Sequence, residues 1–156
     1  MIKASDTIGR DDAFGLSRFI SAQDSVYDRV LEELKSGRKR SHWMWYIFPQ
    51  VDGLGYSATT KHYAIKSMEE ARAYLNHPVL GSRLLECADA VLAIEGRSVS
   101  DILGYPDDLK LQSSMTLFAS VAGPDSVFVR VLDKYFQGEG DVRTLQLLEP
   151  LKGSKD

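Results

Sequence analysis

The feature that most constrains this fold is a succession of short segments in which apolar residues recur at helical spacing, each ended by glycine or proline. Between residues 23 and 36, Val26, Val30 and Leu34 fall at i, i+4 and i+8, and Gly37 follows where a helix commonly ends. The same pattern recurs in four later stretches, at residues 67–76, 78–94, 106–122 and 125–137. Because no stretch alternates convincingly at the two-residue period of a strand, the sequence predicts an all-α fold of seven to nine short helices without a substantial sheet.

Length and local signals define the extent of this bundle. A chain of 156 residues is one ordinary domain. We expect a single helical domain at residues 13–149, with polar tails at residues 1–12 and 150–156. Ser67 and Glu70 predict a capping box at the start of one helix, and Asp141 predicts the start of a last short helix. Pro150 is expected to end the fold.

The segment SHWMWYIFPQ, residues 41–50, is ambiguous in its local structure. Its aromatic and β-branched residues are typical of a strand, but Pro49 ends it and no partner strand follows. We therefore expect a buried irregular segment or a helical turn. The following VDGLGYS indicates a loop whose two glycines can bring the backbone close to another group.

Charge is unevenly distributed along the chain. The whole sequence carries a net charge of −3, yet residues 35–66 contain six cations and one acid, so that this stretch is +5 and the remainder is −8. A local positive region on an acidic domain can face an anion. The alternative is that the cations at 35–40 close a helix, where they favour its C-terminal dipole, or pair with acids elsewhere in the fold.

Composition also excludes several classes of protein. The net negative charge and the lack of a known binding module disfavour nucleic-acid binding. No apolar run is long enough to span a membrane. The single Cys87 excludes an internal disulfide and a cysteine-based metal site, and the three histidines lack ligand spacing, so neither a metal nor a cofactor is expected. These features together predict a cytoplasmic protein.

The aromatic segment supplies the first candidate site residues. His42, between cations and aromatic residues, is a candidate acid or base or an anion donor, and the alternative is a structural histidine bonded to backbone. Trp43 and Trp45 are two positions apart, so they cannot share one environment, and one of them is expected to line a cleft. Gln50 could hydrogen-bond the polar edge of a ligand or cap the loop backbone.

A second set of candidates lies near the start of the stretch 106–122. Lys110, Ser113 and Ser114 fall at i, i+3 and i+4 and are expected to share a polar face suited to phosphate or carboxylate, unless this face is merely solvated. The predicted site is one cleft in which these residues converge with the others. It comprises candidate catalytic residue His42 and candidate ligand-binding residues Arg38, Lys39, Trp43, Trp45, Gln50, Lys110, Ser113 and Ser114.

Six segments carry a resemblance to a known family. They are RFISAQ, GRKRSHWMWYIFPQ, GLGYS, EARAYLNHPVLGSRLLEC, DDLKLQSSMTLFA and KYFQGEGDVRTLQLL. In these segments, which extend over nearly the whole chain, the sequence resembles bacterial domain-of-unknown-function family 1810. Leu103 stands where members often have phenylalanine, a change expected to affect packing alone. The resemblance implies a compact all-helical domain and implies no activity.

Two functions from different classes follow from these features. The first is an enzyme or sensor that binds a small anionic, nucleotide-like molecule, because cations, indoles, a glycine loop and a Lys-Ser-Ser face occur together in a small fold. The second is a protein-binding or regulatory module that uses an exposed aromatic patch. A concave pocket that joins His42, a tryptophan and Lys110 would favour the first, and a flat apolar patch the second.

Overall fold

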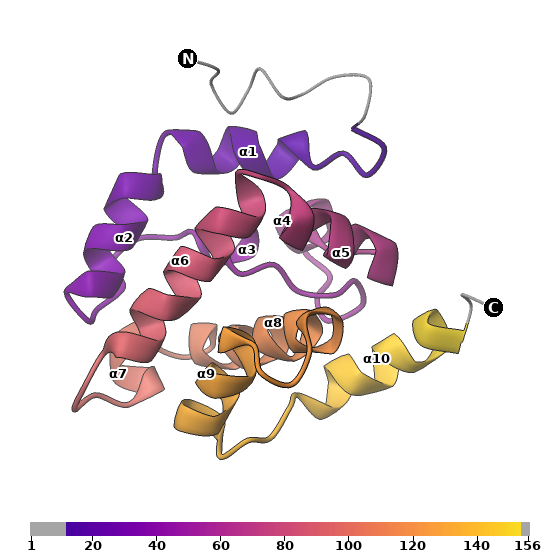
Figure 1. Ribbon diagram of the computed structural model, residues 1–156. Helices are drawn as coiled ribbons and strands as arrows, with labels where there is room; N and C mark the ends of the chain where they lie inside the picture. The colour runs from indigo at the N-terminus through magenta and orange to yellow at the C-terminus, as the bar shows by residue number, and fades with distance from the viewer. Residues whose placement is uncertain (1–11, 154–156) are drawn as a thin grey trace.

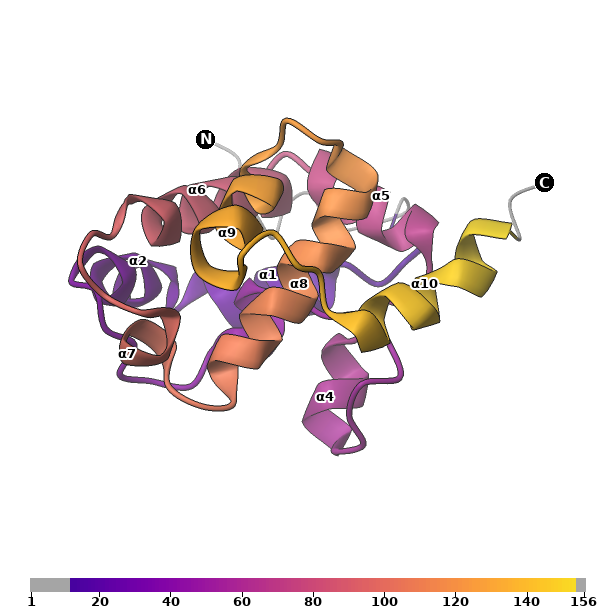
Figure 2. The ribbon, with the colours of Figure 1, turned by 90° about the horizontal axis from the view of Figure 1, so that it is seen from below.

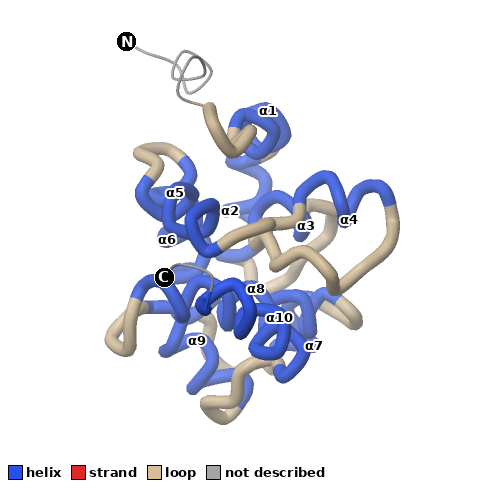
Figure 3. Tube along the Cα trace, turned by 90° about the vertical axis from the view of Figure 1, so that its right-hand side faces the viewer, coloured by secondary structure: helices blue, strands red, loops and turns tan. Residues whose placement is uncertain are grey.

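The computed structural model describes residues 12–153, in which ten helices follow one another along the chain (Figure 1). They are α1 (Ser17–Asp24), α2 (Tyr27–Lys35), α3 (Met44–Ile47), α4 (Ala58–Tyr63), α5 (Met68–Asn76), α6 (Leu80–Ala93), α7 (Val99–Leu103), α8 (Asp107–Ala122), α9 (Val127–Phe136) and α10 (Val142–Gly153). Figure 3 shows no strand in this part of the chain, which confirms the predicted all-α class. The count exceeds the predicted range by one, because the aromatic segment forms the helical turn α3.

Helix α8 lies at the centre of the packing. It contacts α5, α7, α9 and α10, while α6 contacts α2, α5 and α9. In Figure 1, α1 to α5 form the upper part of the molecule and α7 to α10 the lower part, and α6 runs diagonally from one to the other. Seen from below in Figure 2, α4 projects beside the junction of α8 and α10. Segments from the middle and the end of the chain therefore meet along the first half of α8.

The apolar faces predicted from the sequence form the core. Leu84 on α6 and Met115 and Phe118 on α8 are buried, as their helical spacing predicts. The Phe118 ring lies 5.4 Å from that of Tyr74 and 5.8 Å from that of Phe128, so α5, α8 and α9 meet at this side chain. Phe118 is thus a central packing residue of the described chain.

Two predicted helix starts are present. The hydroxyl of Ser67 accepts a hydrogen bond of 3.0 Å from the Glu70 backbone N–H, and Asp141 Oδ2 accepts one of 3.0 Å from the Thr144 N–H. The capping box predicted at Ser67 is incomplete. The Glu70 carboxylate accepts from the Lys66 N–H at 2.9 Å instead of the Ser67 N–H.

Two helix boundaries depend on residues with special backbone properties. Helix α1 begins at Ser17, just after Gly15, whose φ of +66° interrupts helical geometry. Helix α10 continues through Pro150 to Gly153 instead of ending before the proline. Pro150 is exposed in the last turn of α10, where it has no N–H to donate to the carbonyl four residues earlier. The rest of the predicted tails, 1–11 and 154–156, lies outside the described residues.

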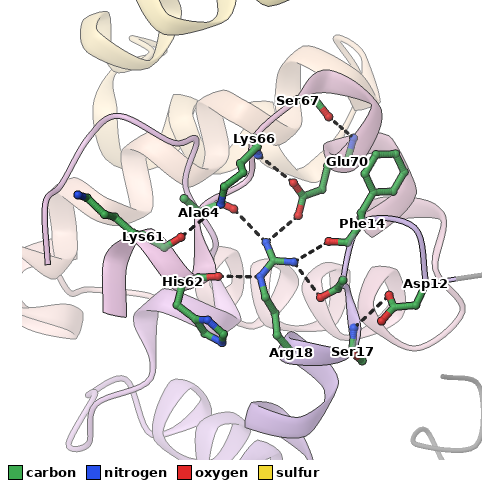
Figure 4. A network of polar contacts seen from close by, with 11 residues as sticks. Asp12, Phe14, Ser17, Arg18, Lys61, His62, Ala64, Lys66, Ser67 and Glu70 are labelled. Carbon is green, nitrogen blue, oxygen red and sulfur yellow. Dashed lines mark hydrogen bonds and ion pairs between the residues drawn. The ribbon is translucent and has the colours of Figure 1, made fainter. Parts of the chain in front are cut away.

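Arg18 ties α1 to the α4–α5 segment, as Figure 4 shows. Its Nε donates to the His62 carbonyl at 2.7 Å, and its Nη2 donates to the Ala64 carbonyl at 3.0 Å and to Glu70 Oε2 at 2.7 Å. Its Nη1 donates to two carbonyls of the turn before α1 at 2.8 Å. All the guanidinium donors therefore have protein acceptors, and these hydrogen bonds fix the backbone at the end of α4.

Candidate functional site

The loop after α3 is held in place by backbone pairing. The Ile65 N–H donates to the Gln50 carbonyl at 2.9 Å, and the Asp52 N–H donates to the Ile65 carbonyl at 2.8 Å. These bonds form the β-bridge between Val51 and Ile65. Gly53 follows with a φ of +108°, which favours glycine, and turns the chain towards α10. Because its backbone is anchored in this way, Gln50 presents its side chain from a fixed position.

A cleft of about 220 Å³ opens between this loop, α4, α8 and α10. Its lining combines cationic, polar and apolar side chains: Gln50, Leu54, Gly55, Thr60, Pro106, Leu109, Lys110, Ser113, Asp141 and Arg143. The Gln50 carboxamide makes no side-chain hydrogen bond to any other residue in the range 12–153. An amide in this state has two donors and an acceptor available for a ligand.

Lys110 is the central cation of the cleft. Its Nζ lies 3.6 Å from Asp107 Oδ1 and 5.1 Å from the centre of the Trp45 ring. The other carboxylate oxygen of Asp107 forms a shorter ion pair, at 2.8 Å, with Lys39 Nζ. One carboxylate thus serves two ammonium groups, and the contact to Lys110 is the longer of the two, so the charge of Lys110 is partly uncompensated.

Asp141 is engaged by its neighbours. Its Oδ2 accepts hydrogen bonds from the Ser113 hydroxyl at 3.0 Å, the Thr144 N–H at 3.0 Å and the Thr144 hydroxyl at 2.5 Å. Arg143, two residues after Asp141, donates to the Gly53 carbonyl at 3.2 Å. These contacts join α8, α10 and the glycine loop. The Asp141 carboxylate has a structural role, while Arg143 has further N–H donors that can bind a ligand.

A family model described as "Protein of unknown function (DUF1810)" matches residues 13–148. The chain belongs to the DUF1810 family. The resemblance found in the sequence motifs is therefore confirmed. Membership assigns no activity, because the family description itself names none.

A solved structure of another protein is similar over most of the chain. It is the conserved hypothetical protein Rv1873 from Mycobacterium tuberculosis, with 54% sequence identity and a TM-score of 0.86. The similarity covers 87% of the present chain and 97% of the other. No curated protein matches the chain significantly. The function of this DUF1810 protein has to be argued from its own site.

The cleft is lined by three of the residues that were predicted to bind a ligand: Gln50, Lys110 and Ser113. Trp45 stands beside it, next to Lys110, and lines a small adjoining pocket together with Gln50. The expected separation of the two tryptophans is present, since Trp43 is buried and Trp45 is partly exposed.

Trp43 is part of the core and does not line the cleft. Its side chain is 1% exposed, and its indole N–H donates to Glu33 Oε1 at 2.9 Å. Glu33 also accepts from the backbone N–H groups of Arg40 and Ser41 and from the Ser41 hydroxyl. The buried carboxylate thus holds the chain between α2 and α3 in place, and the Trp43 side chain lies against it in the core.

The other candidates are not among the residues that line the cleft. His42 and Arg38 are exposed and are absent from the cleft lining. Lys39 pairs with Asp107, which is the pairing with an acid from another helix that the sequence left open. Ser114 is fully buried, because α8 packs on several sides and its 3.6-residue period turns this residue into the core.

Sequence reasoning missed Thr60, Asp141 as a lining residue, and Arg143. Thr60 lies on α4, and the other two lie at the start of α10, about 90 residues from the loop that they face. As polar residues without a local motif, they give no sign in the sequence that they line a site. Within residues 12–153 no group of three or more His, Cys, Asp or Glu is placed to hold a metal ion. None of the helices described is both long and apolar enough to cross a bilayer.

Proposed function

We propose that the cleft binds a small anionic ligand, such as phosphate, pyrophosphate or the phosphate group of a nucleotide-like molecule. The observation that carries the proposal is the meeting of Lys110 and Arg143, from two different helices, in the lining of one concave site. Gln50 and Thr60 add neutral hydrogen-bonding groups at the same cleft. Cations with neighbouring neutral donors are the combination that recognises phosphate oxygens.

The balance of charge in the cleft supports an anion over a cation. The lining contains two cations and one carboxylate, that of Asp141, which already accepts three hydrogen bonds. Asp107, beside the cleft, is shared between Lys39 and Lys110. An incoming anion would therefore meet uncompensated positive charge at Lys110 and Arg143.

The proposal is one of binding, with a sensor favoured over an enzyme. A reaction needs a group that can donate or accept a proton at the ligand. His42, the candidate for that role, is absent from the cleft lining, and Asp141 already accepts hydrogen bonds from Ser113 and Thr144.

We place the protein in the cytoplasm, which is consistent with a single buried Cys87 whose thiol pKa is raised by burial to about 12.

A thermal-shift titration with inorganic pyrophosphate tests this proposal. At about 100 times its Kd, a ligand specific for the folded state adds roughly 2.7 kcal/mol to the free energy of unfolding. We expect that stabilisation in the natural protein and a loss of most of it in Lys110→Met and Arg143→Met. Lys35→Met and Arg130→Met remove the same charge from exposed positions outside the cleft and serve as matched controls.

The controls separate a specific site from general charge. Equal losses of stabilisation in Lys110→Met and Lys35→Met would show that pyrophosphate responds to net charge, and an absence of stabilisation in the natural protein would refute anion binding. The four variants also need unchanged circular dichroism, so that a loss of binding is not a loss of fold.

The alternative function is a protein-binding module, and one observation favours it. Tyr56 and Tyr105 are each 81% exposed and adjoin the lining residues Gly55 and Pro106, and Leu109 is 48% exposed. Large apolar side chains that are exposed to this extent are typical of interaction surfaces. If they hold a protein partner, Tyr56→Ser and Tyr105→Ser abolish that association and leave pyrophosphate binding intact.

A further inference from the structure

A shallow aromatic groove lies next to the cleft. It has a volume of about 520 Å³ and is lined by Trp45, Tyr46, Ala58, Thr59, His62 and Tyr63. Four of these six side chains are aromatic, and they come from the short helices α3 and α4. No part of the groove was anticipated from the sequence except Trp45.

The aromatic rings of the groove support one another. The Tyr63 ring lies 5.4 Å from Tyr46 and 4.6 Å from His62, the latter edge-on at 79°. Tyr63 also contacts Phe19 of the core at 5.7 Å. The backbone of His62 is held by the guanidinium of Arg18 (Figure 4). Ring positions fixed in this way favour a flat ligand, because little conformational freedom is lost on binding.

The groove and the cleft are joined. A narrow pocket between them contains Gln50 and Thr60, which also line the cleft, and Trp45 and Tyr63, which also line the groove. Lys110 Nζ lies 5.1 Å from the centre of the Trp45 ring. An anionic group bonded to Lys110 and a ring packed against Trp45 can therefore belong to one small molecule.

From this continuity we infer that the groove is the ring-binding half of a two-part site, and that the ligand is a nucleoside phosphate. The inference rests on the proposed function, since the cleft must take the phosphate. The aromatic residues of the groove take the base by stacking, which is favourable for every nucleobase because each has a π face. Gln50, at the junction, has a free carboxamide that can pair with a polar edge of the base or with the sugar.

A comparison of AMP with ribose 5-phosphate isolates the contribution of the ring. The two ligands share the phosphate and the sugar and differ in the base. Stacking on an aromatic side chain corresponds to roughly a 5- to 150-fold change in affinity. By isothermal titration calorimetry we expect AMP to bind more tightly than ribose 5-phosphate by a factor in that range. In Trp45→Leu we expect this ratio to fall towards one.

A spectroscopic measurement keeps the test independent of the variant. The chain has two tryptophans, and Trp43 is buried against Glu33 while Trp45 borders the groove. In ¹H–¹⁵N spectra, AMP should shift the indole N–H signal of Trp45 more than ribose 5-phosphate does, and it should leave that of Trp43 in place. Trp43 thus serves as the internal control.

The outcomes separate the two proposals. Equal affinity for AMP and ribose 5-phosphate, with no added shift at Trp45, would overturn the ring site and leave anion binding standing. If ribose 5-phosphate and pyrophosphate both fail to bind, the anion proposal fails and the two-part site fails with it. A base-dependent gain in affinity that survives in Trp45→Leu, without a shift at Trp45, would place the base elsewhere and refute the groove.

Discussion

Replacement of Glu33 by glutamine removes the negative charge that organises the chain between α2 and α3. The Glu33 side chain is 3% exposed, and Oε1 accepts from the Arg40 N–H at 2.8 Å, the Ser41 N–H at 3.2 Å and the Trp43 indole at 2.9 Å. Oε2 accepts from the Ser41 hydroxyl at 2.7 Å. Glutamine has nearly the same shape, so Glu33→Gln changes the charge without creating a cavity.

The expected loss of stability follows from the strength of these hydrogen bonds. A hydrogen bond to a charged group contributes about 1.5–3 kcal/mol, and a neutral one about 0.5–1.5 kcal/mol. In Glu33→Gln the amide oxygen can keep the three N–H donors through weaker, neutral hydrogen bonds. The amide NH2 that replaces Oε2 cannot accept from the Ser41 hydroxyl, so that fourth hydrogen bond is lost. The buried charge also disappears, which removes a desolvation cost and opposes the effect. We expect a net decrease of about 2 kcal/mol in the free energy of unfolding.

Urea unfolding followed by circular dichroism at neutral pH measures this decrease. Glu32→Gln makes the same change of charge at the neighbouring exposed position of α2 and should alter the unfolding free energy by less than about 0.5 kcal/mol. A Glu33→Gln protein as stable as Glu32→Gln would refute the argument that the buried carboxylate organises this segment.

The dependence on pH gives a second measure of the same group. Burial acts to raise the pKa of Glu33, but the hydrogen bonds from Arg40, Ser41 and Trp43 outweigh it and leave the pKa below the ordinary 4.5. A carboxylate with a lowered pKa stabilises the fold fully above the pKa of the unfolded chain. The stability difference between the natural protein and Glu33→Gln should therefore shrink as the pH falls below about 4.5.

Three further predictions concern the scaffold. Phe118→Ala should lower the free energy of unfolding by roughly 3–5 kcal/mol through loss of packing and a cavity, and a loss below about 1 kcal/mol in urea unfolding would contradict its central position. Gly81→Ala should lower the melting temperature despite alanine's higher helix propensity, because an added Cβ would lie 2.0 Å from the Leu75 carbonyl oxygen. An unchanged melting temperature would show that α5 and α6 can move apart without cost. His77 Nδ1 accepts hydrogen bonds from two backbone N–H groups at the start of α6, and burial lowers the pKa of His77. The contribution of His77 to stability should therefore decline as the pH falls below about 6.5. His77→Asn keeps an acceptor that does not titrate, so its free energy of unfolding should vary less between pH 7.5 and 5, and an equal variation would argue against the cap.

Local features of the fold could be predicted from the sequence because they depend on neighbours in the chain. Gly37 has a φ of +81° just after α2, and Ser67 and Asp141 cap the helices that they were predicted to begin. The turn α3 could be anticipated because Pro49 and the absence of a partner strand excluded a sheet. Each of these inferences needs information from a few residues only.

The site could be predicted only in part, because it depends on how α8 is oriented and on contacts distant in sequence. Ser113 and Ser114 are adjacent, yet Ser113 reaches the cleft and Ser114 faces the core. Helix α8 packs on several sides, so the apolar pattern does not define one polar face. Arg143 enters the cleft from α10, and no local pattern connects it with Gln50 or Lys110.

If Lys110 and Arg143 hold an anion between them, a crystal structure of the protein grown with pyrophosphate should show it in place. The concentration is set from the thermal-shift titration, so that a binding site would be saturated. We expect density for a phosphate group in the cleft, within hydrogen-bonding distance of Lys110 Nζ and the Arg143 guanidinium. A saturated crystal with pyrophosphate bound elsewhere, or with water alone between these two side chains, would contradict it.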